Sequence, residues 1–265
     1  MRTVMLGALA ALALTTPAFA AEAEETPICT DRPTKANAIC TVPVGDWQLE
    51  STAAGWSKTA AGGAETKVLT LGSSVVKIGL TDRSDLQIGW TPYVDIKAKE
   101  GGETSSTSGI GDVTVRYKHR LTSDGSAVQL GLIPFVKLPT ASRGIGNRKL
   151  EGGLAVPLSF ALGGGVTATL GPEADLLADG DGDGRHFALV NLINLSGPIA
   201  PRLTLAGELW SNFNFDPAGT VKQASADAAL AYAVSNDVQV DAGANVGLTR
   251  DTADLELYAG ISLRF

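Results

Sequence analysis

The sequence has few of the residues on which catalytic and metal sites usually depend, and it lacks long hydrophobic runs. It contains two cysteines and two histidines among 265 residues, and no G-x-S-x-G motif. Beyond the N-terminal segment, no apolar stretch approaches the about 18 residues of a membrane-spanning helix, which excludes helical spans. Lysine and arginine (21) are outnumbered by aspartate and glutamate (28), so a basic surface for binding nucleic acid is not expected.

The first twenty residues predict a cleaved export signal. Arg2 gives a short basic start, Val4–Leu14 is apolar, and Ala18-Phe19-Ala20 matches a small-x-small cleavage motif. The apolar run is too short to span a membrane as a helix. We therefore expect residues 1–20 to be a signal peptide and residues 21–46 to form a periplasmic N-terminal extension.

The two cysteines, Cys29 and Cys40, both lie in this extension. In an exported chain, an even and closely spaced pair of cysteines predicts a disulfide. No histidine or further cysteine lies nearby, which argues against a metal site. Closing so short a loop contributes about 2–3 kcal/mol of local ordering.

From Trp47 onward, apolar and polar residues alternate in segments of about ten residues, the length of a tilted membrane strand. Successive side chains of a strand point to opposite faces, so each segment has one apolar and one polar face. About twelve segments are joined by alternating short turns and longer loops, among them a polar loop at Glu100–Gly109. The sequence thus predicts an all-β fold, a transmembrane antiparallel up-and-down β-barrel over residues 47–265.

A soluble β-sandwich could have a similar composition, but two features favour the membrane barrel. Several apolar faces are rich in alanine, as at Ala224, Ala226 and Ala228, which would leave voids in a soluble core but not against acyl chains. Aromatic residues gather at segment ends, as the girdles of a membrane barrel do. We therefore expect an integral protein of the bacterial outer membrane, in contact with lipid and lipopolysaccharide. Phe265 resembles the terminal residue that the barrel-assembly machinery binds.

The polar faces carry charges of both signs, which strict alternation places toward the barrel lumen. These charges could line a path for a small-molecule solute, or they could pair across a narrow lumen and close it. Residues 21–46 folded inside the barrel would also close it, and the sequence leaves these alternatives open. The predicted lumen-lining residues are Asp95, Lys97, Arg116, Lys118, Arg120, Lys137, Glu151, Glu173, Asp175, Glu208, Asp241 and Glu256.

An acidic loop offers weak metal candidates. Asp179, Asp181 and Asp183 match the first half of a calcium-binding loop, D-x-D-x-D-G. Val190 stands where the bidentate acid of such a loop belongs, so we interpret the segment as a flexible loop tip. Neither a metal site nor a cofactor is predicted.

A lipid-modifying enzyme is the main catalytic alternative. One family of outer-membrane phospholipases carries a histidine and a serine two positions apart on a strand. At that spacing Leu121 follows His119, and Ala188 follows His186. The sequence therefore predicts that the protein is not an enzyme.

Two stretches near the start of the barrel resemble the MetA-pathway of phenol degradation family of outer-membrane proteins. They are Thr30-Asp31-Arg32-Pro33 and the run from Cys40 to Glu50, which contains T-V-P-x-G. Gly111-Asp112-Val113 and Leu138-Pro139-Thr140 resemble internal landmarks of the family. The resemblance spans most of the chain beyond the signal peptide. It implies no particular binding residues, and a cysteine pair is not expected throughout the family.

The resemblance implies an outer-membrane transporter or channel, associated with the uptake of aromatic compounds. We therefore expect passive uptake of small aromatic or hydrophobic solutes. A closed barrel with a structural or surface-interaction role is the alternative, and a lipid-modifying enzyme is less favoured.

Overall fold

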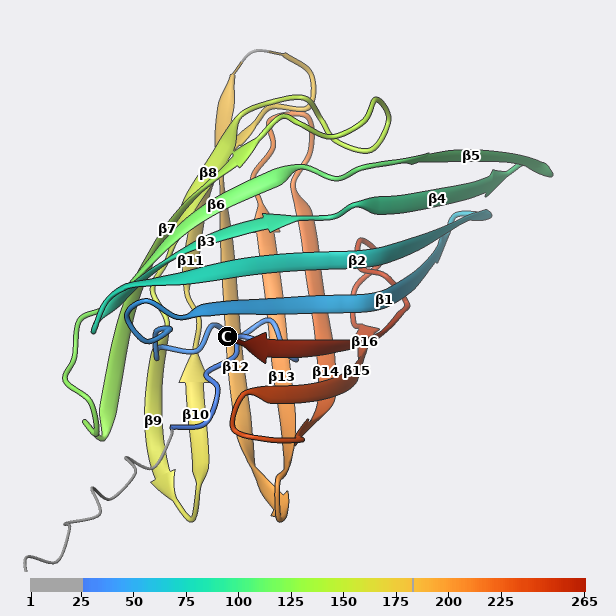
Figure 1. Ribbon diagram of the computed structural model, residues 1–265. Helices are drawn as coiled ribbons and strands as arrows, with labels where there is room; N and C mark the ends of the chain where they lie inside the picture. Colours follow the sequence, from blue (N-terminus) through green and yellow to red (C-terminus); the bar gives the residue numbers. More distant parts are fainter. Residues whose placement is uncertain (1–25, 183) are drawn as a thin grey trace, which may run out of the picture.

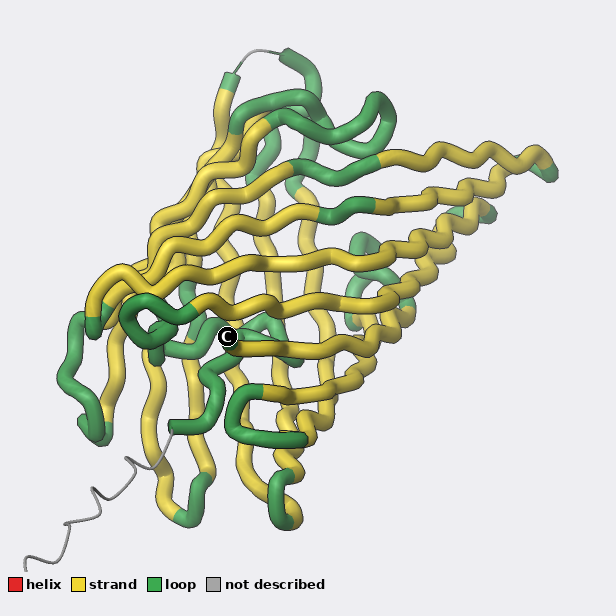
Figure 2. The backbone as a smooth tube through the Cα atoms, viewed as in Figure 1, coloured by secondary structure: helices red, strands yellow, loops and turns green. Residues whose placement is uncertain are grey.

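The chain folds into one closed β-barrel in a computed structural model that describes residues 26–182 and 184–265 (Figures 1 and 2). The signal peptide predicted for residues 1–20 lies outside the described residues. In the described part of the chain, no helix is long and apolar enough to cross a membrane. The strands are β1 (Trp47–Ala61), β2 (Ala64–Thr81), β3 (Ser84–Trp90), β4 (Tyr93–Glu100), β5 (Glu103–Gly109), β6 (Val113–Arg120), β7 (Val128–Leu138), β8 (Glu151–Ala155), β9 (Leu158–Gly163), β10 (Val166–Leu170), β11 (Glu173–Ala178), β12 (Arg185–Ala200), β13 (Leu203–Asn214), β14 (Val221–Ala233), β15 (Val238–Gly247) and β16 (Leu255–Arg264).

Eight of these segments are halves of four interrupted strands. β3 and β4 both pair with β2, while β6 pairs with β3 and β5 pairs with β4. In the same way, β8 and β9 both pair with β7, and β10 and β11 both pair with β12. Counting each interrupted strand once gives twelve strands, and antiparallel pairing of β1 with β16 closes the ring. The predicted fold class is confirmed.

Proline explains three of the four interruptions. Pro92, Pro157 and Pro172 stand where the two halves of a strand meet, and a proline has no N–H to donate to the ladder. The carbonyl groups remain paired, since Gly131 N–H donates to Pro157 O (3.0 Å) and Val156 N–H donates to Pro172 O (2.9 Å). The strands therefore bend at these positions without opening the wall.

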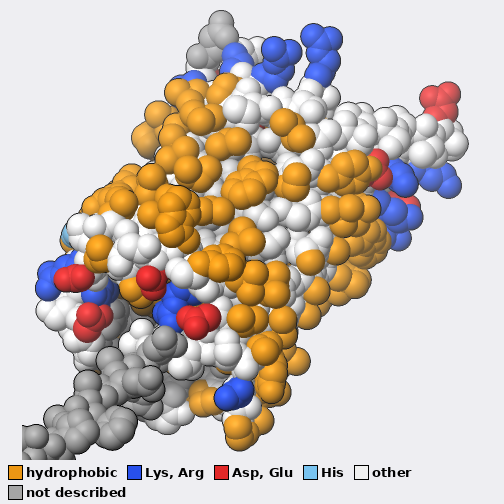
Figure 3. All heavy atoms as spheres, in the orientation of Figure 1, with side chains coloured by type: hydrophobic (Ala, Val, Ile, Leu, Met, Phe, Trp, Pro, Cys, Tyr) orange, Lys and Arg blue, Asp and Glu red, His pale blue; other side chains and the backbone are white. Residues whose placement is uncertain are grey.

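The outer face of the barrel is apolar. On β12, for example, Leu189, Ile193 and Leu195 are exposed, while Ala188 and Asn194 on the other face are buried. Figure 3 shows such side chains as a broad band over the visible face, with charged residues gathered toward its ends. Polar residues face the interior, which is the reverse of a soluble protein.

The strict alternation of faces breaks on β1. The β1–β16 register shifts between Thr52 and Ala54, which is a β-bulge at Ala53. At the same level Gly72 adopts φ +66° on β2, and the β3–β4 interruption follows. The extra residue turns Trp56 toward the exposed Leu257, on the outer face.

This reversal places two predicted lumen residues on the outside. Trp56 lies opposite Leu69, and Leu69 lies opposite Asp95. Asp95 and Lys97 therefore share the outer face with Trp56, not the lumen to which unbroken alternation assigns them. The polar segment expected as a loop at Glu100–Gly109 is largely β5, which extends with β1, β2 and β4 beyond the rest of the barrel (Figure 1).

Candidate functional site

Residues 28–42, which we call the plug, lie inside the barrel. The sequence predicts a periplasmic coil for residues 21–46, with a position inside the barrel as an alternative. Ala36, Ile39 and Val42 are buried, with at most 9% of each residue exposed. The alternative in which the extension folds inside fits this arrangement. The predicted disulfide between Cys29 and Cys40 is confirmed, and it closes the loop that carries most of the plug's contacts.

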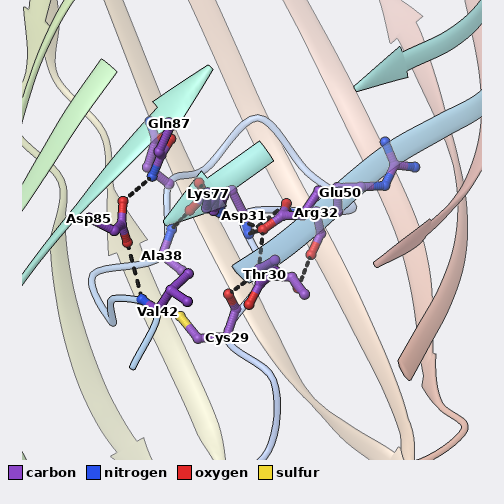
Figure 4. Close-up of polar contacts among 12 residues, drawn as sticks. Cys29, Thr30, Asp31, Arg32, Ala38, Val42, Glu50, Lys77, Asp85 and Gln87 are labelled. Carbon is purple, nitrogen blue, oxygen red and sulfur yellow. Dashed lines mark hydrogen bonds and ion pairs between the residues drawn. The ribbon is translucent and has the colours of Figure 1, made fainter. Parts of the chain in front are cut away.

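Asp31 is the centre of the plug's attachment to the wall (Figure 4). Its carboxylate accepts hydrogen bonds from Lys77 Nζ on β2 (2.6 Å) and Lys118 Nζ on β6 (2.7 Å), and from the N–H of Ala38 (2.8 Å). Burial opposes ionisation of Asp31, but the ammonium groups of Lys118 and Lys77 outweigh it and hold the pKa of this carboxyl well below its usual range. The group is therefore a fixed anion between two strands.

Glu50 on β1 holds the same stretch of plug backbone. Its carboxylate accepts hydrogen bonds from the N–H groups of Asp31 (3.1 Å) and Arg32 (3.1 Å), and it also pairs with Lys77. A buried carboxylate is stable only when its oxygens are satisfied in this way. Two backbone groups, one ammonium and the side-chain amide of Gln48 (2.8 Å) satisfy it here.

Two plug cations reach the opposite wall. The Arg32 guanidinium pairs with Asp241 on β15 (2.5 Å) and lies 5.9 Å from the centre of the Tyr258 ring. Lys35 Nζ pairs with Asp227 on β14 (2.5 Å). These pairs join the plug to β14 and β15, whereas Asp31 joins it to β2 and β6.

Backbone N–H groups complete the attachment. Those of Lys35 and Ala36 donate to the two carboxylate oxygens of Glu208 on β13, at 3.1 and 3.0 Å. Asn194 on β12 donates to Glu208 (3.1 Å) and to Thr34 of the plug (3.3 Å). The plug is therefore bound to strands around much of the ring.

Four predicted lumen residues contact the plug: Arg116, Lys118, Glu208 and Asp241. The others lie elsewhere. Arg120 pairs with Asp124 at a short turn, and Lys137 pairs with Glu151 (2.9 Å) near the long loops. Glu256 accepts a hydrogen bond from Asn245 on β15 (2.8 Å), and Glu173 and Asp175 are half-buried on β11. Their part in solute passage stays a prediction.

Lys77 and Asp85 are not among the site residues predicted from the sequence, nor is any residue of the plug except the cysteines. Asp85 accepts a hydrogen bond from the N–H of Val42 (3.2 Å). The available signal was the charge of the extension itself, because Asp31, Arg32 and Lys35 are opposite in sign to their partners on the wall. Pairing across so long a sequence separation cannot be read from alternation.

Two cavities border the plug. The larger one, the chamber, has a volume of about 570 Å³ and lies between the plug and β7, β9, β10 and β12–β15, near the short turns. The smaller one, the vestibule, has about 190 Å³ and lies between the plug and β1, β2 and β6. Asp31, Arg32, Thr34, Ala36 and Asn37 line both cavities, so this stretch of plug separates them.

The acidic loop forms a contact with a histidine. The Asp179 carboxylate accepts a hydrogen bond from His186 Nδ1 at 2.8 Å, and the Gly180 N–H donates to Asp216 (2.9 Å). Asp183, one of the three weak metal candidates with Asp179 and Asp181, lies outside the described residues. Within the described ranges, no group of three or more metal-ligating side chains could hold an ion.

A closed ring of twelve strands with an apolar outer face defines an integral β-barrel of the bacterial outer membrane. The family described as "Putative MetA-pathway of phenol degradation" matches residues 30–265, and the chain belongs to this family. The match includes most of the plug as well as the whole barrel. No protein of curated function matches the chain.

Solved outer-membrane structures share the fold at low sequence identity. The COG4313 outer membrane channel from Pseudomonas putida F1 is 16% identical, with a TM-score of 0.69 over 86% of this chain and 98% of that chain. The NanC porin is 12% identical, with a TM-score of 0.54 over 82% and 98%. The translocator domain of autotransporter NalP from Neisseria meningitidis is 14% identical, with a TM-score of 0.55 over 84% and 90%.

Proposed function

We propose that the protein is a passive outer-membrane channel for small solutes. The observation that carries the proposal is the pair of cavities, which lie on either side of the plug inside a closed barrel. A solute that moves from the vestibule to the chamber has only the stretch around Thr34–Asn37 to pass. The similarity to the COG4313 outer membrane channel supports the same conclusion.

The family's description links it to phenol degradation, which favours small aromatic or hydrophobic solutes as cargo. The proposal includes no catalytic step. His119 stacks on the exposed Tyr117 with ring centres 6.1 Å apart, and His186 is bonded to Asp179. Neither arrangement presents a nucleophile to a bound lipid.

A closed barrel is the second candidate, and the plug's attachment favours it. Buried ion pairs to β2, β6, β14 and β15 resist displacement of the plug. Such a barrel would act as a structural or surface-interaction protein.

Planar lipid bilayers distinguish the two candidates. We expect purified protein to produce discrete channel openings, and reconstituted liposomes to take up small solutes faster than protein-free liposomes. A barrel that is folded by circular dichroism but gives neither openings nor uptake would contradict the channel and leave the closed barrel.

A further inference from the structure

The two cavities on the proposed path differ in their charge. Of the twelve residues that line the vestibule, six are charged: Asp31, Arg32, Lys35, Glu50, Lys77 and Arg116. Of the twenty-five residues that line the chamber, two are charged, Asp31 and Arg32. Both are paired with other groups, Asp31 with Lys77 and Lys118 and Arg32 with Asp241.

The chamber owes its space to small residues on the inner faces of the strands. Ala206 on β13 and Ala229 and Ala231 on β14 are buried and face the plug, where a larger side chain would fill the gap. On the same strands, Glu208 and Asp227 are the next inward positions, and both bind the plug. The wall therefore changes from anionic to uncharged within two residues.

Hydroxyl and amide groups supply the polar part of the chamber. Ser159 on β9 and Thr169 on β10 share a hydrogen bond of 2.7 Å, and further groups of this kind come from neighbouring strands. They can donate to or accept from a neutral solute but cannot compensate a full charge removed from water.

We propose that the chamber is a solute-binding site that selects neutral, hydrogen-bonding compounds over ions. The methyl groups of Ala206, Ala229 and Ala231 contact the carbon skeleton, and the surrounding hydroxyl and amide groups bind its polar atoms. This inference rests on the proposed channel function and specifies the class of its substrate. The charged groups of the vestibule hold the plug, and the chamber selects neutral solutes over ions.

Uptake of two solutes of similar size into liposomes tests the inference, with erythritol as the neutral probe and erythronate as the anion. We expect the wild-type protein to pass erythritol about tenfold faster or more, because the anion loses its hydration in an uncharged chamber. Equal rates would overturn the inference while leaving the channel in place. If neither solute enters, the proposed function itself fails.

Substitution locates the selectivity. Ala231→Lys adds a cation to the chamber and should raise erythronate uptake relative to erythritol several-fold above the ratio in A231Q, which adds similar length without charge. An unchanged ratio in A231K would overturn the assignment of selectivity to the chamber. If A231K does not assemble, A206K makes the same test from β13, with A206Q as its control.

Discussion

At the scale of single residues, Asp31 decides how the plug is held. Its carboxylate accepts hydrogen bonds from two lysines on two strands and from one N–H of the plug itself. Lys118 has a further acceptor in Ala38 O (2.7 Å), and Lys77 has one in Glu50. These secondary contacts orient the lysines, but the negative charge that both share belongs to Asp31.

We therefore expect Asp31→Asn to destabilise the protein strongly. The substitution keeps the size of the side chain but removes one partner of buried ion pairs, a change that costs about 3–5 kcal/mol. Denaturant unfolding in detergent, followed by circular dichroism, measures the loss. Glu103→Gln at the exposed tip of the β4–β5 hairpin is the matched control. Equal stability of D31N and E103Q would contradict the role of Asp31.

The same carboxyl gives the plug a defined response to pH. Its pKa in the folded protein is below the value of about 4 in an unfolded chain, so the unfolded chain takes up the proton first as the pH falls. The stabilisation is complete above about pH 4 and disappears as the pH falls through the folded-state pKa. We expect the stability difference between wild type and D31N to be constant from pH 8 to 5 and to shrink below pH 4. A difference that shrinks between pH 7 and 5 would show that another group dominates.

At the scale of elements, alternation of apolar and polar residues predicts the twelve strands, but it assigns the inner and outer faces wrongly in one part of the barrel. It succeeds where an unbroken ladder keeps a constant face toward lipid, as on β13–β16. It fails beyond the bulge at Ala53, because a single extra residue exchanges the two faces of β1 and of the strands paired to it. The sequence leaves open whether the plug lies in the periplasm or inside the barrel, because its position depends on ion pairs between segments that are distant in the chain.

The exchanged faces place a row of lysines on the outside of the barrel. Lys58 lies opposite Lys67, and Lys67 lies opposite Lys97, on the outer face of β1, β2 and β4. Like charges in facing positions repel one another. Glu65, at 2.9 Å from Lys58 and 2.7 Å from Lys67, and Asp95, at 3.5 Å from Lys97, neutralise only part of the row. The row lies beyond Trp56, toward the long-loop end, where the phosphate groups of outer-leaflet lipopolysaccharide would meet it.

We expect K67Q/K97Q to reduce the binding of lipopolysaccharide. Each lysine near an anionic lipid surface contributes about 1 kcal/mol, so the double variant should weaken binding about tenfold or more. Titration of detergent-solubilised protein with lipopolysaccharide measures this affinity. R83Q/R202Q removes the same charge at the short-turn end and should bind as the wild type does. Equal affinity of the two double variants would contradict the contact.

At the scale of the whole molecule, barrel and plug form one polar interior enclosed by an apolar surface. Closure through β1 and β16 leaves no free strand edge in the membrane. The plug divides the interior without filling it, since its residues line both cavities, and ion pairs such as those of Arg32 and Lys35 hold it to the wall. The conductance of the channel should therefore depend on how firmly these pairs hold the plug.

R32A/K35A tests this dependence, since it removes the two cations that fasten the plug to β14 and β15. Asp31 and Glu50 still bind the plug, and Glu208 still holds the backbone N–H groups of residues 35 and 36, so we expect the plug to stay in the lumen but to loosen at β14 and β15. The vestibule and chamber would then join, and single-channel conductance in planar bilayers should rise several-fold while the preference for erythritol over erythronate falls. R83A/K222A removes the same charge away from the plug and should conduct as the wild type does. If R32A/K35A matches this control in both measurements, the plug does not limit passage, and solutes cross the barrel by a route that bypasses it.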